Sequence, residues 1–199
     1  NTNYYKSIIE ITINCLNLKQ HNIEELILLC KQKNEKAQCE IYNRYAKAMY
    51  NVCYRIVKDA HFAEDVMQEG FMKAFTKIND YKQEVAFGAW LKRIIVNGSI
   101  DFYKKNNQFK VEDFNTTIYK TEDATQNDTD DTNYNELKVK QILQTINSLK
   151  YNYRMILTLF YIEGYDSEEI SEILKISYPN CRTTLSRAKD CLRKKLAEI

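Results

Sequence analysis

Arginine, threonine and serine side chains near the end of this 199-residue sequence have the chemistry to bind nucleic acid. At about 100° per residue they gather on one arc of a helix, which consists of Arg182, Thr183, Ser186, Arg187 and Asp190. An arginine can donate two hydrogen bonds to a guanine edge, and hydroxyl groups reach base edges or phosphates. The arc therefore suits a helix that lies in the major groove of DNA.

The opposite face of this segment is an apolar stripe of Cys181, Leu185, Ala188, Leu192 and Leu196. A shorter helix is predicted just before it, with Asp166 as the N-cap and Glu169 completing a capping box. Ser177 is the predicted cap of the later helix, and Pro179 falls in its first turn. Together they predict a helix-turn-helix. The alternative is an ordinary helical hairpin with a solvated basic face.

Charge is distributed unevenly along the chain. The formal net charge is +2, yet residues 111–136 contain eight acidic residues and one lysine. That segment carries −7 and leaves +9 on the remainder, a distribution typical of a polyanion-binding protein with a separate acidic element.

The sequence lacks the spacings that metal sites and catalytic sites require. The six cysteines form no C-x-x-C pair, and His21 and His61 lack ligand spacing, so we expect no metal and no cofactor. There is no glycine-rich phosphate loop or nucleophile–base pair. A helical synthase with metal at residues 128–131 is a weak alternative, because no second acidic cluster accompanies them. The sequence predicts a binding protein, not an enzyme.

In the rest of the chain apolar residues recur at helical spacing, and no segment shows the alternation of apolar and polar residues typical of a strand. Helices are predicted at residues 23–33, 35–57, 63–78, 86–105, 137–149 and 153–162. A polar loop at residues 79–84 precedes the fourth helix, whose expected core is Phe87, Trp90, Leu91, Ile94 and Phe102. Residues rich in Asp, Thr and Asn then interrupt the period and predict a flexible linker. The expected fold is all-α, with an extension (1–22), a helical domain (23–106), an acidic linker (107–135) and a second helical domain (136–199).

Three stretches together resemble one protein family. FAEDVMQEGFMKAF (residues 62–75) and FGAWLKRIIVNGSIDFYKK (residues 87–105) resemble region 2 of bacterial extracytoplasmic-function (ECF) sigma factors. IEGYDSEEISEILKISYPNCRTTLSRAKDCLRKKL (residues 162–196) resembles their region 4. The resemblance implies a dissociable RNA polymerase subunit that directs promoter recognition, promoter melting and transcription initiation. The alternative is a helix-turn-helix regulator that binds duplex DNA without being a polymerase subunit.

The resemblance also implies site residues in region 2. Asp65, Gln68, Glu69 and Met72 would meet the polymerase clamp, although an acidic helix face is by itself more typical of a solvated surface. The minus-ten element would be held by Lys92, Arg93, Asn97 and Trp90 and by the loop at residues 79–84. A core position for Trp90, and a plain surface role for Asn97, are the alternatives.

In region 4 the positions that match the family's minus-thirty-five readers are Arg182, Thr183, Ser186 and Arg187, with Lys189 on phosphate. Two departures from the usual pattern are Pro179-Asn180-Cys181, where Gly-Thr-Val is common, and Thr183-Thr184, where a Ser-Arg pair is common. The missing arginine removes one contact to phosphate or to a base. The promoter sequence that this protein recognises therefore does not follow from the resemblance.

The partners that the resemblance implies are core RNA polymerase (clamp and flap), promoter DNA and an anti-sigma factor. The sequence has no apolar run long enough to span a bilayer and no signal peptide, so we expect a cytoplasmic protein without direct membrane insertion. The acidic linker is either a solvated tether or a polyanion mimic in the polymerase's RNA-exit path. The second hypothesis predicts that replacing its acidic residues by serine changes the pattern of abortive transcripts.

Overall fold

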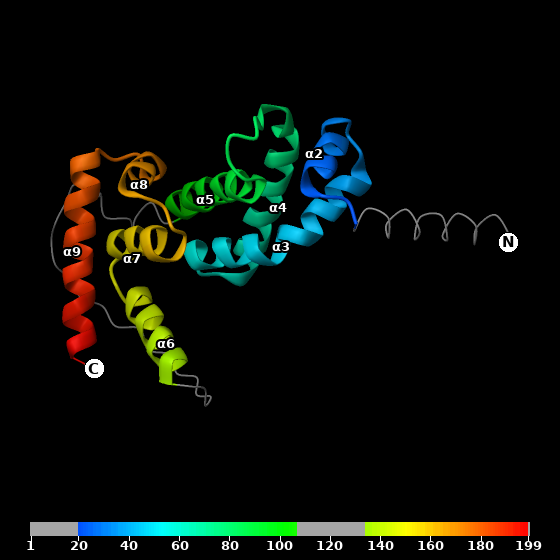
Figure 1. Ribbon diagram of the computed structural model, residues 1–199. Coiled ribbons are helices and arrows are strands. Elements are labelled where there is room, and N and C mark those ends of the chain that lie inside the picture. Colours follow the sequence, from blue (N-terminus) through cyan, green and yellow to red (C-terminus); the bar gives the residue numbers. More distant parts are fainter. Residues whose placement is uncertain (1–19, 107–133, 199) are drawn as a thin grey trace, which may run out of the picture. The chain divides into compact units, whose positions relative to one another are not determined.

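The computed structural model describes residues 20–106 and 134–198, and every regular element within these ranges is a helix (Figure 1). The predicted all-α fold is thereby confirmed. The chain divides into two compact units, Asn1–Tyr103 and Lys104–Ile199, and each is described by itself. Most of the predicted extension and linker lies outside the described residues, so the domain boundaries at residues 22, 106 and 135 stay predictions.

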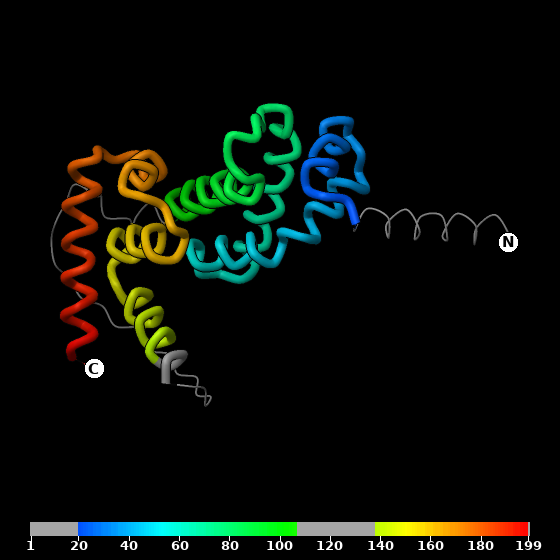
Figure 2. The backbone as a smooth tube through the Cα atoms, viewed as in Figure 1, coloured from blue at the N-terminus to red at the C-terminus, as the bar shows by residue number. Residues whose placement is uncertain are grey.

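The described residues of the first unit form a bundle of four helices and one short 3-10 turn, whose path Figure 2 traces from blue to green. Its elements are α2 (Ile23–Lys31), α3 (Glu35–Val57), α4 (Ala60–Thr76), η1 (Ile78–Asp80) and α5 (Phe87–Asn106). Side-chain caps fix where three of them begin. Asn22, Asn34 and Asp59 each accept a hydrogen bond from a backbone N–H of the first helical turn.

The core of this unit follows the apolar period of the sequence with one exception. Ile41, Val52 and Ile56 of α3 are buried, as their spacing by threes and fours predicts. In α5 the expected core was partly wrong, because Ile94 and Phe102 are only half-buried, while Ile95, Val96 and Ile100 are fully buried. Ile94, Ile95 and Val96 are three apolar residues in succession, so the periodicity could not indicate which of them faces the core.

Several element boundaries also differ from the prediction, among them three in α4 and α2. Helix α4 begins at Ala60 and not at residue 63, because the Asp59 carboxylate accepts from the Phe62 N–H at 3.0 Å. It ends at Thr76, and Ile78 belongs to the 3-10 turn. Helix α2 ends at Lys31, two residues earlier than predicted, because Lys33 takes a left-handed conformation with φ 61°.

The second unit packs α7 and α9 against each other and carries α8 before the turn into α9 (Figure 1). Its elements are α6 (Tyr134–Asn147), α7 (Tyr151–Leu157), a π-helical turn η2 (Thr158–Ile162), α8 (Ser167–Leu174) and α9 (Tyr178–Ala197). The helix predicted at residues 153–162 thus changes to a wider coil after Leu157. Met155, Ile156, Leu157 and Leu159 form the centre of the unit and are fully buried.

No helix in the described ranges is both long enough and apolar enough to cross a membrane.

Candidate nucleic-acid interface

Each of the helices α8 and α9 begins at a side-chain cap. The Asp166 carboxylate accepts from the backbone N–H groups of Glu168 and Glu169, both at 2.8 Å, and the Glu169 side chain accepts from Asp166 N–H at 2.9 Å. The Ser177 hydroxyl accepts from Asn180 N–H at 3.4 Å. Both predicted caps are confirmed. Each such cap stabilises a helix by about 1 kcal/mol; the Asp166 cap fixes where α8 starts, and the Ser177 cap fixes where α9 starts.

Helix α9 has the two faces that its sequence predicts. Cys181, Leu185, Ala188 and Leu192 are buried against the rest of the unit, and Leu196 is half-buried. Burial raises the pKa of the Cys181 thiol, which keeps it neutral and suited to this apolar contact. The stripe holds α9 with its other face turned to solvent.

The exposed face of α9 presents Arg182, Thr183, Ser186 and Arg187. The Arg182 guanidinium carbon lies 5.9 Å from the ring centroid of Tyr178, which is 42% exposed in the first turn. The Thr183 hydroxyl donates to the Pro179 carbonyl at 2.9 Å and keeps its lone pairs available. The arrangement offers guanidinium and hydroxyl groups along two turns, which fits a major groove.

Lys189 and Thr184 do not lie on the exposed polar face of α9. Lys189 is half-buried, and its Nζ lies 4.2 Å from the Phe160 ring centroid and 5.5 Å from that of Tyr161. Its position is nearest the apolar stripe, so its side chain turns to the aromatic rings of η2, a cation–π contact. Thr184, where an arginine is common, is buried, and its hydroxyl donates to the Asn180 side-chain oxygen at 3.1 Å.

In the first unit, α5 gathers three of its four predicted minus-ten residues on one face. Trp90, Arg93 and Asn97 follow each other by three and four residues and are half-buried, whereas Lys92 lies on another side of the helix. Trp90 is neither core nor fully exposed. Its indole centroid lies 5.3 Å from that of Tyr81 and 5.6 Å from that of Phe87.

Sequence analysis missed Tyr81, which was counted in a polar loop. The ring is buried at 7% exposure, and its hydroxyl donates to the Val85 carbonyl at 2.7 Å, closing the loop on itself. Burial raises the pKa of Tyr81, and the charge of Glu24 and the neighbouring Tyr45 raise it further. The aromatic residue between two polar ones was the signal that could have identified it.

Helix α4 exposes all four residues of the predicted polymerase-binding patch, Asp65, Gln68, Glu69 and Met72. Met72 is 71% exposed, while Val66 and Phe71 on the other side of the helix are buried. Carboxylates and an amide around an exposed thioether suit a protein surface with basic and apolar groups, and repel phosphates.

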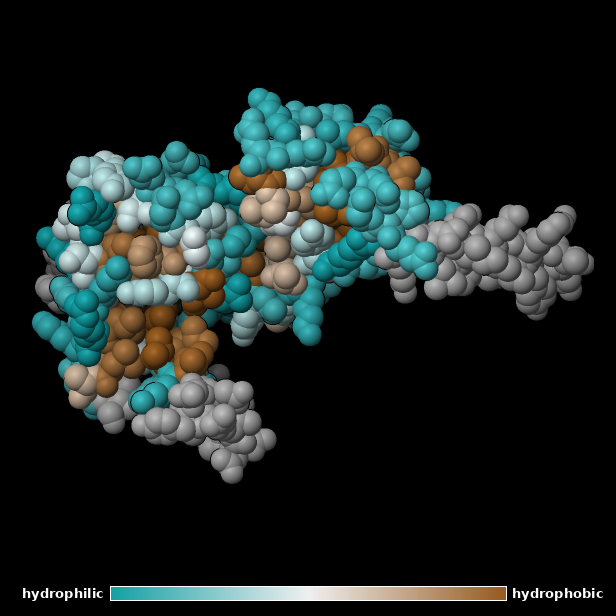
Figure 3. Space-filling view, in the orientation of Figure 1, coloured by the Kyte–Doolittle hydropathy of each residue, from teal (hydrophilic) through white to brown (hydrophobic). Residues whose placement is uncertain are grey.

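Apolar residues also gather on the second unit, where Figure 3 shows a brown area beside α6 and α9. On α6 itself, three large apolar side chains are exposed, those of Val139, Ile142 and Leu143. Among the described residues, no group of three potential metal-ligating side chains comes together.

Comparison with known proteins matches these two units to two regions of one family. Residues 41–109 match the family model of sigma-70 region 2, and residues 140–192 match that of sigma-70 region 4. The ECF RNA polymerase sigma factor SigW of Bacillus subtilis (strain 168) is 30% identical over 192 residues, covering 89% of this chain and 98% of SigW. The chain belongs to the ECF sigma factors. The B. subtilis sigma factor SigM is also 30% identical, over 77% of this chain and 91% of its own.

Solved structures support the fold. CnrH, solved in complex with the cytosolic domain of CnrY, gives a TM-score of 0.52 at 20% identity over 87% of this chain and 96% of CnrH. The sigma factor RpoE of Bartonella quintana, solved with the anti-sigma factor NepR, gives a TM-score of 0.54 at 19% identity, over 79% of this chain and 95% of RpoE.

Membership makes this ECF sigma factor a non-catalytic subunit of RNA polymerase that directs transcription initiation. The alternatives of a metal-dependent synthase and of a regulator outside the polymerase are thereby excluded.

Proposed function

We propose that this ECF sigma factor divides promoter recognition between its two units. The unit of α2–α5 binds the polymerase clamp and captures the minus-ten element, and the unit of α6–α9 reads the minus-thirty-five element. The single observation that carries this division is helix α9, which buries its apolar stripe and exposes Arg182, Thr183, Ser186 and Arg187. A capped, two-faced helix is what major-groove reading requires.

At the minus-thirty-five element, Arg182 and Arg187 are the proposed readers of guanine edges, and Thr183 and Ser186 contact base edges or phosphates. The Tyr178 ring under Arg182 restricts the guanidinium and lowers the entropy that binding would cost. Lys189 reaches phosphate only by leaving the rings of Phe160 and Tyr161, so its contribution is the smallest of the predicted set.

At the minus-ten element, the face of Trp90, Arg93 and Asn97 stands beside the loop that Tyr81 closes. The half-exposed indole can stack on an unpaired base, and the Asn97 amide can hydrogen-bond a base edge. Lys92, on a different side of α5, serves the phosphate backbone in this proposal. Stacking and charge together offset the few kcal/mol that unstacking a base costs.

The polymerase contacts are assigned by surface chemistry. The exposed carboxylates of Asp65 and Glu69, with Gln68 and Met72, face the clamp. The apolar area of Val139, Ile142 and Leu143 on α6 is the proposed contact for the flap, because exposed apolar groups of this size favour a protein partner.

An anti-sigma factor is a further proposed partner, supported by the complexes in which CnrH and RpoE were solved. A cytoplasmic location is proposed with it, since core polymerase and the promoter must both be reachable.

The division can be tested with two variants in complex with core polymerase, on a promoter found by run-off transcription. Arg187→Ala should weaken binding to duplex minus-thirty-five DNA by roughly tenfold or more and leave binding of a single-stranded minus-ten oligonucleotide unchanged. Trp90→Ala should do the reverse, because its contact is with the unpaired strand. Equal effects of both variants on both ligands would overturn the division.

A further inference from the structure

The loop between η1 and α5 has one buried anchor and an exposed tip. Tyr81 is packed edge-on against Phe87 at 5.5 Å between ring centroids and tilted against Trp90 at 5.3 Å. Residues 82–86, which follow it, are all exposed. The position of Tyr81 therefore determines where the exposed part of the loop stands relative to the indole of Trp90.

Helix α2 contacts the backbone of this anchor. The Lys31 ammonium donates to the Tyr81 carbonyl at 3.4 Å, across 50 positions of sequence. Glu24 lies seven residues earlier, and two helical turns bring both side chains to one face of α2. Burial is the main cause of the raised pKa of both Tyr81 and Tyr45, and the negative charge of Glu24 raises both further.

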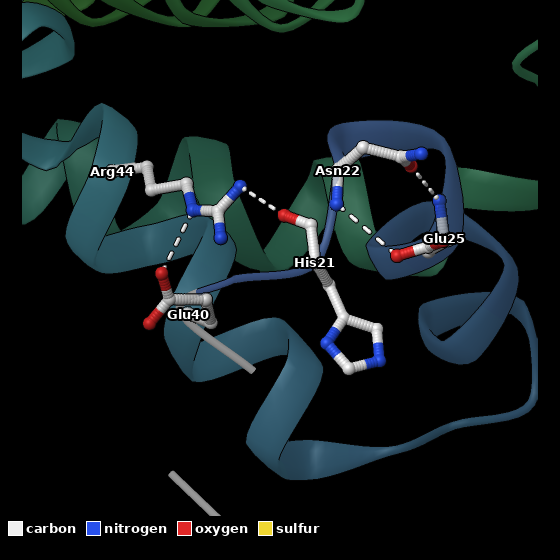
Figure 4. A network of polar contacts seen from close by, with 5 residues as sticks. All are labelled: His21, Asn22, Glu25, Glu40 and Arg44. Carbon is white, nitrogen blue, oxygen red and sulfur yellow. Dashed lines mark hydrogen bonds and ion pairs between the residues drawn. The ribbon is translucent and has the colours of Figure 1, made fainter. Parts of the chain in front are cut away.

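Helix α2 is itself held by polar contacts at its start (Figure 4). Asn22 and Glu25 form a capping box, with hydrogen bonds of 2.8 and 3.2 Å. The Arg44 guanidinium of α3 donates to the His21 carbonyl at 2.9 Å and pairs with Glu40 at 2.8 Å. Buried Leu26, Ile27 and Cys30 complete the attachment of α2 to the bundle.

We propose that α2 is a positioning element for promoter melting: fixed to α3 through Arg44, it holds the minus-ten loop in its capturing conformation through Lys31. The inference rests on the proposed role of the loop and of Trp90 at the minus-ten element. Lys31 is a positioning residue, since it contacts the loop backbone and has no need to touch DNA. A loop held in place loses less entropy when it binds the unpaired strand.

The test compares Lys31→Met with wild type in complex with core polymerase. Opening is followed by a fluorescent base analogue in the minus-ten element of a promoter found by run-off transcription. We expect the opening rate, and the affinity for a single-stranded minus-ten oligonucleotide, to fall roughly three- to tenfold, the effect of one lost hydrogen bond. Affinity for core polymerase and for duplex minus-thirty-five DNA should stay within twofold of wild type.

Two control variants separate positioning from folding. Lys31→Arg keeps a cationic donor and should restore most of the opening rate. Lys36→Met removes an exposed lysine at the start of α3 and should leave all readouts unchanged. If Lys31→Met lowers every affinity together with the melting temperature, its role is structural and the proposal is overturned.

The Trp90→Ala variant distinguishes failure of this inference from failure of the function beneath it. Slow opening with Trp90→Ala and normal opening with Lys31→Met would overturn the role of α2 and leave the capturing loop in place. Normal opening with both variants would overturn the capturing role itself.

Discussion

At the scale of single residues, we propose that specificity for the minus-thirty-five element depends on Arg182. Its guanidinium is exposed and lies over the Tyr178 ring, so it is held where a base edge can be met. We expect Arg182→Ala to lower the affinity for the best minus-thirty-five duplex by about 1–3 kcal/mol and to relax preference at one base pair. Binding of a library of single-base variants measures both effects.

Arg193 provides the matched control on the same helix. Its side chain is 73% exposed and pairs with Asp190 at 2.5 Å, and it lies six residues C-terminal to Arg187, the last of the proposed base readers. Arg193→Ala should weaken binding slightly and equally for every duplex, because contacts to phosphate carry no base information. A change of base preference with Arg193→Ala and none with Arg182→Ala would contradict the assignment.

At the scale of elements, the contact between α4 and α5 depends on a glycine. A Cβ at Gly70 would stand 2.3 Å from Ile95 Cδ1, and Ile95 is fully buried. Gly70→Ala should therefore lower the free energy of unfolding by about 1–3 kcal/mol despite alanine's better helix propensity. Urea unfolding measures this change, and adding Ile95→Val should recover part of it.

Gly98 is the control within the same pair of helices. A Cβ there would have no atom within 4 Å, so Gly98→Ala should raise the free energy of unfolding by roughly 0.5–1 kcal/mol. The two changes in the free energy of unfolding need not be equal in size. A stabilising Gly70→Ala, however, would show that α4 and α5 do not approach as closely as described.

How far the sequence predicted these elements depended on whether the signal was local. The caps Asp166 and Ser177 were both predicted, because a cap is a contact between residues two or three apart. The apolar face of α9 was predicted because its period is clean. Such signals were enough for the fold and for the exposed face of the candidate site.

What was missed depended on contacts between distant residues. The Tyr81 ring packs against Phe87 of α5, and its carbonyl accepts a hydrogen bond from Lys31 of α2. No local sequence pattern predicts either contact. Lys189 shares the edge of the polar arc, and only the fold brings Phe160 beneath it. The π-helical turn lies in a largely apolar stretch of sequence. Such a stretch has no hydrophobic periodicity from which a change to a wider helical turn could be predicted.

At the scale of the whole molecule, binding to core polymerase should depend on the exposed face of α4. Glu69→Lys reverses a charge in the patch of Asp65, Gln68, Glu69 and Met72, and we expect it to weaken core binding at least tenfold by like-charge repulsion. Affinity for minus-thirty-five duplex should not change. Glu64→Lys, about 140° around the same helix from Glu69, is the charge-matched control.

Fluorescence titration of labelled protein with core polymerase distinguishes these variants. Equal loss of binding with Glu64→Lys and Glu69→Lys would indicate a general effect of charge, and the patch would then not be the contact.

The most direct test of two-element promoter recognition is run-off transcription with purified core polymerase on genomic promoter fragments, with and without this sigma factor. We predict defined start sites that require the sigma factor, with a shared upstream element at minus ten and another at minus thirty-five. Arg187→Ala should abolish dependence on the second element, and Trp90→Ala should slow opening at the first. Start sites that share only one upstream element, or that persist unchanged with both variants, would contradict it.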